Sequence, residues 1–187
     1  YVDLINKRFH PTDRGKLLTP VDEAPMASAG QMWLENNLQL WQQLPRILRD
    51  ACYKVPDYFL ALQATPQQQS QYYKALEGYA LEDYKSIPLL IDWSKHQKVL
   101  DVGGGLGCLL FRLLDAHAHL EGVLLDLPSV IKHVQVPIAL KNRCHLLGAN
   151  FFEKWQEKSD AIILSRVLHD WEDVKALELL KQARKSL

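Results

Sequence analysis

The sequence carries no excess charge of either sign and very little cysteine. Lys+Arg and Asp+Glu both total 22 in 187 residues, and none of the three cysteines forms a C-x-x-C pair. A chain without net charge has no long-range field to attract nucleic acid phosphates or an anionic membrane, so we expect neither partner. An odd number of scattered cysteines favours free thiols in a reducing compartment, and we predict a cytoplasmic protein.

Long apolar runs are also absent. No stretch approaches the roughly 18 uninterrupted apolar residues that indicate a membrane span. Residues 1–10, YVDLINKRFH, contain neither the basic nor the apolar part of a secretory signal. The hydrophobic fraction of 48% and the charged fraction of 24% are typical of a soluble globular protein.

The sequence pattern changes near residues 93–98, and helical periodicity dominates before that point. Over residues 32–52, apolar residues recur every three or four positions, which predicts one face of a helix with a kink or a break at Pro45. The residues of this face are Leu34, Leu38, Trp41, Leu44, Leu48 and Ala51.

Two further signals lie in the first half of the chain. Residues 65–68, TPQQ, form a capping box that predicts the start of a second helix, and Pro88 marks its expected end. Residues 7–20 suggest a small hairpin whose turn is Asp13–Gly15. This hairpin has too few apolar residues for a core of its own.

From residue 98 onward the pattern alternates between strands and helices, which predicts a parallel sheet covered on both faces. Ligands of such sheets bind at the carboxyl ends of the strands, near the point where the strand order reverses. The last helix is expected to place Val174, Leu177, Leu180 and Ala183 on one apolar face. Strands are expected at 98–102, 122–126, 145–148 and 161–165, and helices at 106–117, 128–134 and 171–187.

Polar and aromatic residues follow each expected strand where a nucleoside would need them. Residues 99–107, VLDVGGGLG, end a strand in a glycine turn that permits a close backbone approach. Asp126 ends the second strand and can accept both ribose hydroxyls. After the third strand, the amide of Asn150 could read an adenine edge and Phe151 could lie along the ring. His169 follows the fourth strand.

The spacing of the glycines favours an adenosine ligand without a diphosphate. Dinucleotide sites use G-x-G-x-x-G, whereas Gly103, Gly105 and Gly107 give G-x-G-x-G and Cys108 follows. Asp101 would repel a pyrophosphate and would suit the ammonium and sulfonium groups of S-adenosylmethionine. A nicotinamide-dependent oxidoreductase remains an alternative that rests on the glycine loop alone.

Four segments in this order resemble the motifs of the S-adenosylmethionine-dependent O-methyltransferase family, which includes plant caffeate-type, acetylserotonin, and bacterial polyketide and phenazine enzymes. Upstream, FHPTDRGKLL resembles the wing of the family's winged-helix dimerisation region, and YYKAL resembles the helix that leans on donor and acceptor. The four segments are VLDVGGGLG, VLLDLPSVI, GANFFE and AIILSRVLHDWED.

The resemblance implies a fold of the α/β class. We expect an incomplete Rossmann-like methyltransferase sheet of about four parallel strands, preceded by a helical region and by the end of a winged-helix dimerisation domain. The corresponding divisions are 1–25, 26–92 and 93–187. Because methyltransferase sheets of this type have seven strands, we expect the chain to be a fragment of one roughly twice as long. It would be homodimeric at full length, and the fragment alone is expected to bind the donor weakly and to be inactive.

The resemblance also implies residue roles. His169 matches the general base that takes a proton from the acceptor hydroxyl, which favours O-methylation over N- or C-methylation. Ser165 stands where plant relatives carry a lysine, and Asn150 stands where relatives usually carry an aspartate. Leu76 and Ala80 replace a common methionine and serine. The residues implied to bind the donor are Asp101, Gly103, Gly105, Asp126, Leu127, Asn150, Phe151 and Ser165, and those implied near a small-molecule acceptor are Tyr72, Leu76, Asp170 and Trp171.

These departures leave a second interpretation open, in which the chain is a catalytically silent homologue that acts as a dimeric binding or scaffold protein. The donor expected for an active enzyme is S-adenosylmethionine, and its product is S-adenosylhomocysteine. No metal site is expected, because His117 and His119 form an H-x-H pair without a third ligand. The acceptor itself is not named by any motif.

Overall fold

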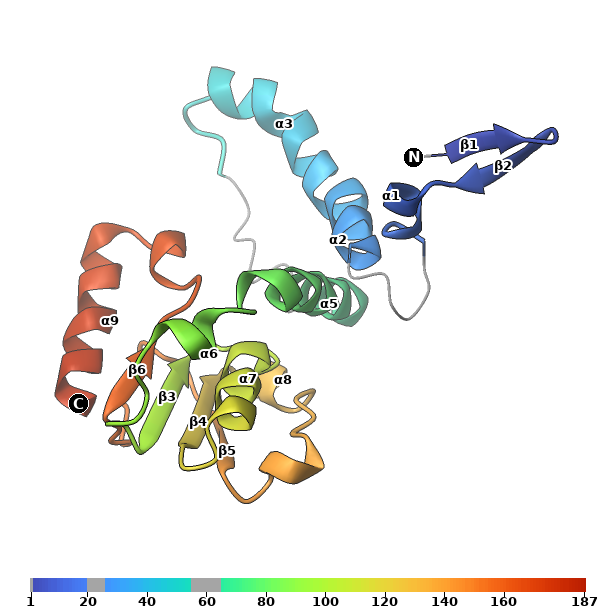
Figure 1. Cartoon of the computed structure of the whole chain (residues 1–187). Coiled ribbons are helices and arrows are strands. Elements are labelled where there is room, and N and C mark those ends of the chain that lie inside the picture. The colour runs from blue at the N-terminus through green and yellow to red at the C-terminus, as the bar shows by residue number, and fades with distance from the viewer. Residues whose placement is uncertain (1, 20–25, 55–64) are drawn as a thin grey trace. The chain divides into compact units, whose positions relative to one another are not determined.

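The structure is a computed structural model that describes residues 2–19, 26–54 and 65–187. The chain forms two compact units, Tyr1–Glu82 and Asp83–Leu187, whose elements are labelled in Figure 1. This division lies upstream of the pattern change near residue 93, because Tyr84 and Trp93 pack in the core of the second unit.

The first unit begins with an antiparallel hairpin of strands β1 (Val2–Ile5) and β2 (Arg8–Pro11). Its turn is Asn6–Lys7, both with positive φ, of 52° and 60°. The predicted turn at Asp13–Gly15 is wrong, because these residues open the short helix α1 (Asp13–Lys16). The hydroxyl of Thr12 caps this helix by accepting a 3.1 Å hydrogen bond from the Gly15 amide.

A nearly continuous helical path follows, comprising α2 (Ala27–Met32), the π-helical turn η1 (Trp33–Asn37) and α3 (Leu38–Arg49). Pro45 lies inside α3, so the chain does not divide into two helices there, and the predicted kink stays a prediction. The irregular turn of this path is η1. Four residues of the predicted apolar face, Leu38, Trp41, Leu44 and Leu48, belong to α3, while Leu34 lies in η1 and Ala51 lies beyond α3. None of the four is buried in the described part of the chain.

Helix α5 (Pro66–Asp83) begins at the proline that the capping box predicted. It ends at Asp83 rather than near Pro88, which lies in the first turn of the next helix, α6 (Ile87–Leu90). Proline is tolerated there because the first-turn amides of a helix need no intrahelical acceptor. A small core of Ala29, Met32 and Ala75, flanked by Met26, Tyr72 and Tyr79, holds α2 against α5.

The second unit contains a four-stranded sheet in the order β5-β4-β3-β6, and every pairing is parallel. This confirms the predicted parallel α/β fold and all four strands. The chain runs from β3 to β4 and β5 in one direction and returns to β6 on the other side of β3, so the strand order reverses at β3. The strands are β3 (Lys98–Val102), β4 (Glu121–Asp126), β5 (Cys144–Gly148) and β6 (Ala161–Ile163).

Helices α7 (Cys108–Ala116), α8 (Pro128–Ile131) and α9 (Asp173–Ser186) connect or follow the strands, with 3₁₀ turns η2 (Ile138–Leu140) and η3 (Leu168–Asp170). The two central strands, β3 and β4, are short apolar runs buried on both faces, as in parallel sheets generally. The edge strands β5 and β6 are more exposed. No helix in the described ranges is long and apolar enough to cross a membrane.

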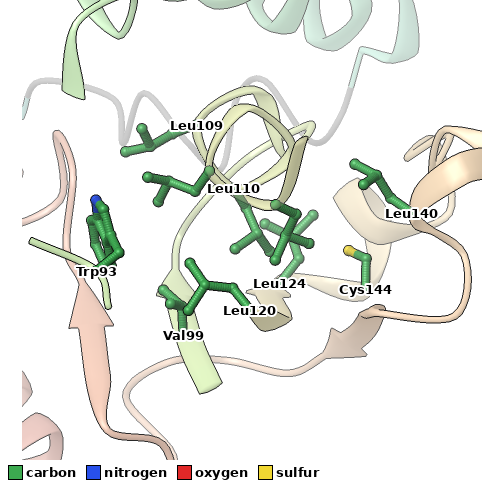
Figure 2. Close-up of a cluster of buried hydrophobic side chains, with 10 residues drawn as sticks. Trp93, Val99, Leu109, Leu110, Leu120, Leu124, Leu140 and Cys144 are labelled. Carbon is green, nitrogen blue, oxygen red and sulfur yellow. The ribbon is translucent and has the colours of Figure 1, made fainter. Parts of the chain in front are cut away.

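Alternate residues of the strands feed two separate cores. On one face, Val99 and Leu124 meet Leu110 of α7, and Figure 2 shows this cluster extending to Trp93 and Cys144. On the other face, strand residues meet α9. Each fully buried leucine contributes about 1.5–3 kcal/mol to folding. The second core comprises Leu100, Val102, Val123, Leu125, Trp155, Val167, Leu179 and Ala183.

Helix α9 is rotated from the predicted orientation. Val174 and Leu177 are 70% and 51% exposed, whereas Leu179 is fully buried. The buried residues of the helix are Leu179, Ala183 and Ser186, so only Ala183 of the predicted face is correct. Leu179 and Ala183 instead pack in the second core, against residues of the sheet.

Candidate functional site

The glycine loop connects β3 to α7 at the carboxyl end of the strand where the sheet order reverses. Gly103, Gly105 and Gly107 all have left-handed φ, of 70°, 61° and 86°. A Cβ at Gly103 would lie 2.8 Å from the Val167 Cγ2 atom, so protein packing excludes a side chain there. A Cβ at Gly105 would meet no described atom within 4 Å. Gly105 is therefore the point at which the loop backbone faces open space.

Asp126 ties this loop to the end of β4. Its Oδ2 atom accepts a 2.8 Å hydrogen bond from the Gly105 amide, and its Oδ1 atom accepts a 2.7 Å bond from the Leu127 amide. Burial raises the pKa of Asp126, and the two amides act in the opposite direction. Each oxygen keeps a second lone pair. The carboxylate can therefore hold the loop and still accept a hydroxyl.

Asp101 lies beneath the same loop and has no such partners. It is 1% exposed, and neither carboxylate oxygen has a hydrogen-bond partner among the described residues. Burial, followed by the charge of Asp126, raises the pKa of Asp101 to about 7. A Cβ at Gly104 would lie 2.5 Å from Asp101 Oδ2, which places the carboxyl directly against the loop. An unpaired buried carboxylate here fits a ligand that carries positive charge.

The segment after β5 brings Phe151 to the glycine loop, but the side-chain oxygen of Asn150 is hydrogen-bonded within the segment itself. The Phe151 ring lies 3.4 Å from the position of a Cβ at Gly103. The Asn150 Oδ1 atom accepts a 3.0 Å hydrogen bond from the Phe152 amide, so the side chain shapes its own turn. The geometry thus places Phe151 near the expected ligand, while the amide oxygen of Asn150 is already engaged.

The segment after β6 places Ser165 and His169 on the same side of the sheet. The Ser165 hydroxyl is hydrogen-bonded to the Tyr84 hydroxyl at 2.8 Å. The His169 side chain is 67% exposed, and its Nε2 atom lies 3.2 Å from Asp170 Oδ1. Burial raises the pKa of Asp170, and the neighbouring His169 acts in the opposite direction. Tyr84 was missed in the sequence because no motif marks it.

Trp171 extends the site as part of an aromatic cluster. Its ring packs edge-on against Phe152 at 4.6 Å and lies 6.0 Å from Phe151. The Lys175 ammonium lies over the Trp171 ring, 5.1 Å from its centroid. Phe152 is a further residue that the sequence reasoning did not assign.

Two expected acceptor-side residues, Tyr72 and Leu76, belong to the first unit, so their role stays a prediction. In the described part of the chain no group of three potential ligands is positioned for a metal ion. His117 Nε2 lies 2.9 Å from the Pro88 carbonyl oxygen, and His119 Nε2 lies 3.1 Å from that of Trp93. Both imidazoles thus have backbone partners.

The parallel sheet, with a glycine loop and two carboxyl groups at the carboxyl ends of its strands, is typical of α/β proteins that bind nucleosides. The sequence profile of the O-methyltransferase domain matches residues 41–187, and the chain belongs to this family.

Individual relatives agree with this assignment. The chain is 30% identical over 133 residues to a phenazine O-methyltransferase of Lysobacter antibioticus, which covers 70% of this chain and 39% of that protein. Mitomycin 7-O-methyltransferase superposes with a TM-score of 0.88 at 23% identity, over 99% of this chain and 58% of that one.

A third similar protein is an O-methyltransferase from neocarzinostatin biosynthesis, solved with S-adenosylmethionine and 2-hydroxy-5-methyl naphthoic acid. It superposes with a TM-score of 0.80 at 25% identity, over 99% of this chain and 60% of that one. The chain therefore spans less than two thirds of the length of each of these three proteins.

Proposed function

We propose that this chain is the donor-binding part of an S-adenosylmethionine-dependent O-methyltransferase. The observation that carries the proposal is the loop at Gly105, which faces open space, is held by Asp126 and lies over the unpaired carboxyl of Asp101. A nicotinamide dinucleotide would bring a pyrophosphate to this loop, and the buried carboxyl beneath it would oppose that charge.

The residues fit the donor in the following way. Gly103 and Gly105 would face its methionine part, with the charge of Asp101 below the loop. Asp126 would accept the ribose hydroxyls, while Leu127 and Phe151 would flank the adenine, and Ser165 and Asn150 would complete the site. S-adenosylmethionine supplies a methyl group on a sulfonium, which is a good leaving group. The protein's main task is therefore to align the acceptor oxygen with that methyl group.

His169 would act as the general base. Its imidazole is exposed at the edge of the site and has Asp170 beside it, at 3.2 Å from Nε2. A neutral imidazole within hydrogen-bond distance can accept the proton of a phenol or enol, which makes the oxygen a better nucleophile. Asp170 would orient the ring and stabilise the imidazolium that forms.

The proposed acceptor is a small, flat aromatic molecule. The edge-on pair of Phe152 and Trp171 offers an aromatic surface next to His169. One relative acts on a phenazine, and one similar structure holds a naphthoic acid. Tyr72 and Leu76 stay predicted acceptor residues. A homodimer at full length and a cytoplasmic location complete the proposal.

A second candidate is a catalytically silent homologue that binds the donor without turning it over. It is supported by the side chains of Ser165 and Asn150, which already have partners within the protein. This candidate shares the donor site, so the first experiment tests both. Turnover of a panel of phenols by a donor-binding protein would separate them.

The experiment is a calorimetric titration of S-adenosylhomocysteine into the 187-residue chain, repeated with Asp126→Ala and Gly105→Val. We expect binding to wild type, and at least a tenfold loss of affinity in each variant. Asp126→Ala removes the hydroxyl acceptor. Gly105→Val adds a side chain to the open point of the loop. Glu157→Gln, at the opposite end of β3, is the matched control and should bind like wild type.

Folding of each variant is checked by circular dichroism, since Gly105 has a positive φ and valine is strained there. A folded wild-type chain that binds NAD but not S-adenosylhomocysteine would contradict the proposal.

A further inference from the structure

Two consecutive residues in the loop after β6 are bonded through their side chains to two consecutive residues at the start of the second unit. The Ser165 hydroxyl lies 2.8 Å from the Tyr84 hydroxyl, and the Arg166 guanidinium forms an ion pair with the Asp83 carboxylate. We call these four residues the latch. Sequence motifs assign a role to only one of them, Ser165.

The latch lies at a backbone conformation that is unfavourable for a residue with a side chain. Arg166 has a φ of 55°, a left-handed conformation that side-chain-bearing residues rarely adopt. Such conformations persist where the surroundings hold them, and they cluster at functional sites. Here the two fastenings flank the peptide bond between residues 165 and 166.

Tyr84 gives the latch a fixed anchor. Its ring packs against the core cluster that contains Trp93 and Val99, while its hydroxyl reaches Ser165. Asp83 is the last residue of α5 and the first residue of the second unit. The β6 loop is therefore fastened to the sheet's own core at the place where the chain enters this unit.

The residues just after the latch contact the donor loop and carry the proposed base. Val167 is buried, and its Cγ2 atom is what excludes a side chain at Gly103. His169 follows two residues later in η3. A change in the backbone at Arg166 would therefore move Val167 against the glycine loop and His169 together.

We propose that Asp83 and Tyr84 are positioning residues, which hold the β6 loop so that His169 keeps its place relative to the glycine loop. The role given to the latch rests on the methyl transfer proposed above, whereas the contacts that form the latch do not depend on it. The latch predicts that the loop loosens when either fastening is removed, whatever the acceptor is.

Hydrogen exchange of the 187-residue chain, read by mass spectrometry, tests the latch. In Tyr84→Phe and in Asp83→Asn, we expect the amides of residues 165–170 to exchange several-fold faster, while β3 and β4 keep wild-type protection. Asp83→Glu should restore slow exchange because it returns the charge. Unchanged exchange in the folded variants would overturn the proposal.

Two matched controls remove the same chemical groups elsewhere. Tyr79→Phe deletes a tyrosine hydroxyl that accepts a hydrogen bond from Trp33, and Glu157→Gln breaks the half-exposed ion pair with Lys98. Neither should alter exchange at residues 165–170. Equal acceleration by these controls would also overturn the latch. If Asp83→Asn does not fold, Tyr84→Phe decides the question, since it removes one oxygen and keeps the packed ring.

A spectroscopic signature separates positioning from stability. The imidazole ¹³C–¹H signal of His169 in the NMR spectrum is assigned by its loss in His169→Asn. Its chemical shift should change in Tyr84→Phe and stay the same in Tyr79→Phe. Titration with S-adenosylhomocysteine distinguishes a failure of the proposed function from a failure of the latch. Absence of binding by wild type would count against the proposed function alone. Binding together with an unmoved His169 signal and unchanged exchange would count against the latch alone.

Discussion

Two carboxyl groups beneath one loop have opposite surroundings. Asp126 accepts hydrogen bonds from two backbone amides, while Asp101 has no partner in the described chain. Charge at Asp101 is therefore much less favourable than charge at Asp126. A residue in this state is a poor contributor to stability, which is common at ligand sites.

The pH dependence of stability should reveal Asp101. Its pKa is raised to about 7 in the folded protein, by burial and then by the charge of Asp126, whereas an unfolded aspartate titrates near its ordinary 3.8. Between these values the folded state binds the extra proton, so stability falls as the pH rises from about 4 to about 7. The slope from this group is at most about 1.4 kcal/mol per pH unit.

Asp101→Asn removes the titrating group and keeps the shape. In urea unfolding of this variant, we expect the part of the pH dependence that comes from Asp101 to disappear. The free energy of unfolding of the variant minus that of wild type should therefore be larger at pH 7.5 than at pH 4.5. Asp160→Asn is the control, since this exposed carboxyl lies at the other end of β3. Parallel curves for Asp101→Asn and wild type would contradict the unpaired, buried state of Asp101.

At the scale of elements, apolar periodicity identified the helices but not always the buried face. In α9 the spacing of large apolar residues indicates a face through Val174, Leu177 and Leu180, and yet those residues are exposed. The sheet instead contacts the face with Leu179 and Ala183. A hydrophobic pattern says which residues can share a face, whereas the partner surface decides which face is buried.

Neighbouring leucines in α9 give a matched test. Leu179 is 0% exposed and Leu180 is 45% exposed. We expect Leu179→Ala to lower the free energy of unfolding by about 2–5 kcal/mol, because it leaves a cavity against the sheet. Leu180→Ala should lower it by less than about 1 kcal/mol. Chemical denaturation measures both, and equal losses would mean that the helix is rotated from its position here.

At the scale of the whole molecule, large apolar side chains of the first unit are exposed along its helical path in the described structure. Leu34, Trp41 and Leu48 on the helical path from α2 to α3 are 69%, 58% and 76% exposed. Exposed apolar side chains that gather on one helix face are typical of an interaction surface. The proposed homodimer would cover them with a second copy.

Association should therefore depend on this face. We expect sedimentation velocity to show concentration-dependent self-association of the chain. The double variant Leu34→Lys with Leu48→Lys should raise the dissociation constant of this association at least tenfold. Ile138→Lys, a change at an isolated residue that is 85% exposed in the second unit, is the control. A chain that stays monomeric at all concentrations, or a double variant that associates like wild type, would argue against this face as the interface.

Much of the second unit was predictable because its signals are local. Short apolar runs ending in Asp101 or Asp126, a glycine turn, and leucines at helical spacing in α7 each depend on residues close in sequence. The first unit was less predictable, since its turn at Asn6–Lys7 and its unbroken α3 depend on competition between similar local signals. The donor-site roles from Asp101 to Ser165 and the base role of His169 remain predictions for the titrations to test.

The sequence by itself determined the parallel α/β fold, the place of the glycine loop and the family, because these follow from local periodicity and ordered motifs. Tertiary structure alone decided which face of α9 is buried and that Asp101 has no hydrogen-bond partner among the described residues while Asp126 has two. It also decided that Tyr84 and Asp83 hold the loop before His169. Apart from the bond from the adjacent Leu127 amide to Asp126, the hydrogen bonds and ion pair among these contacts join residues about 20 to 80 positions apart. No local pattern encodes a pairing that only the folded chain brings together.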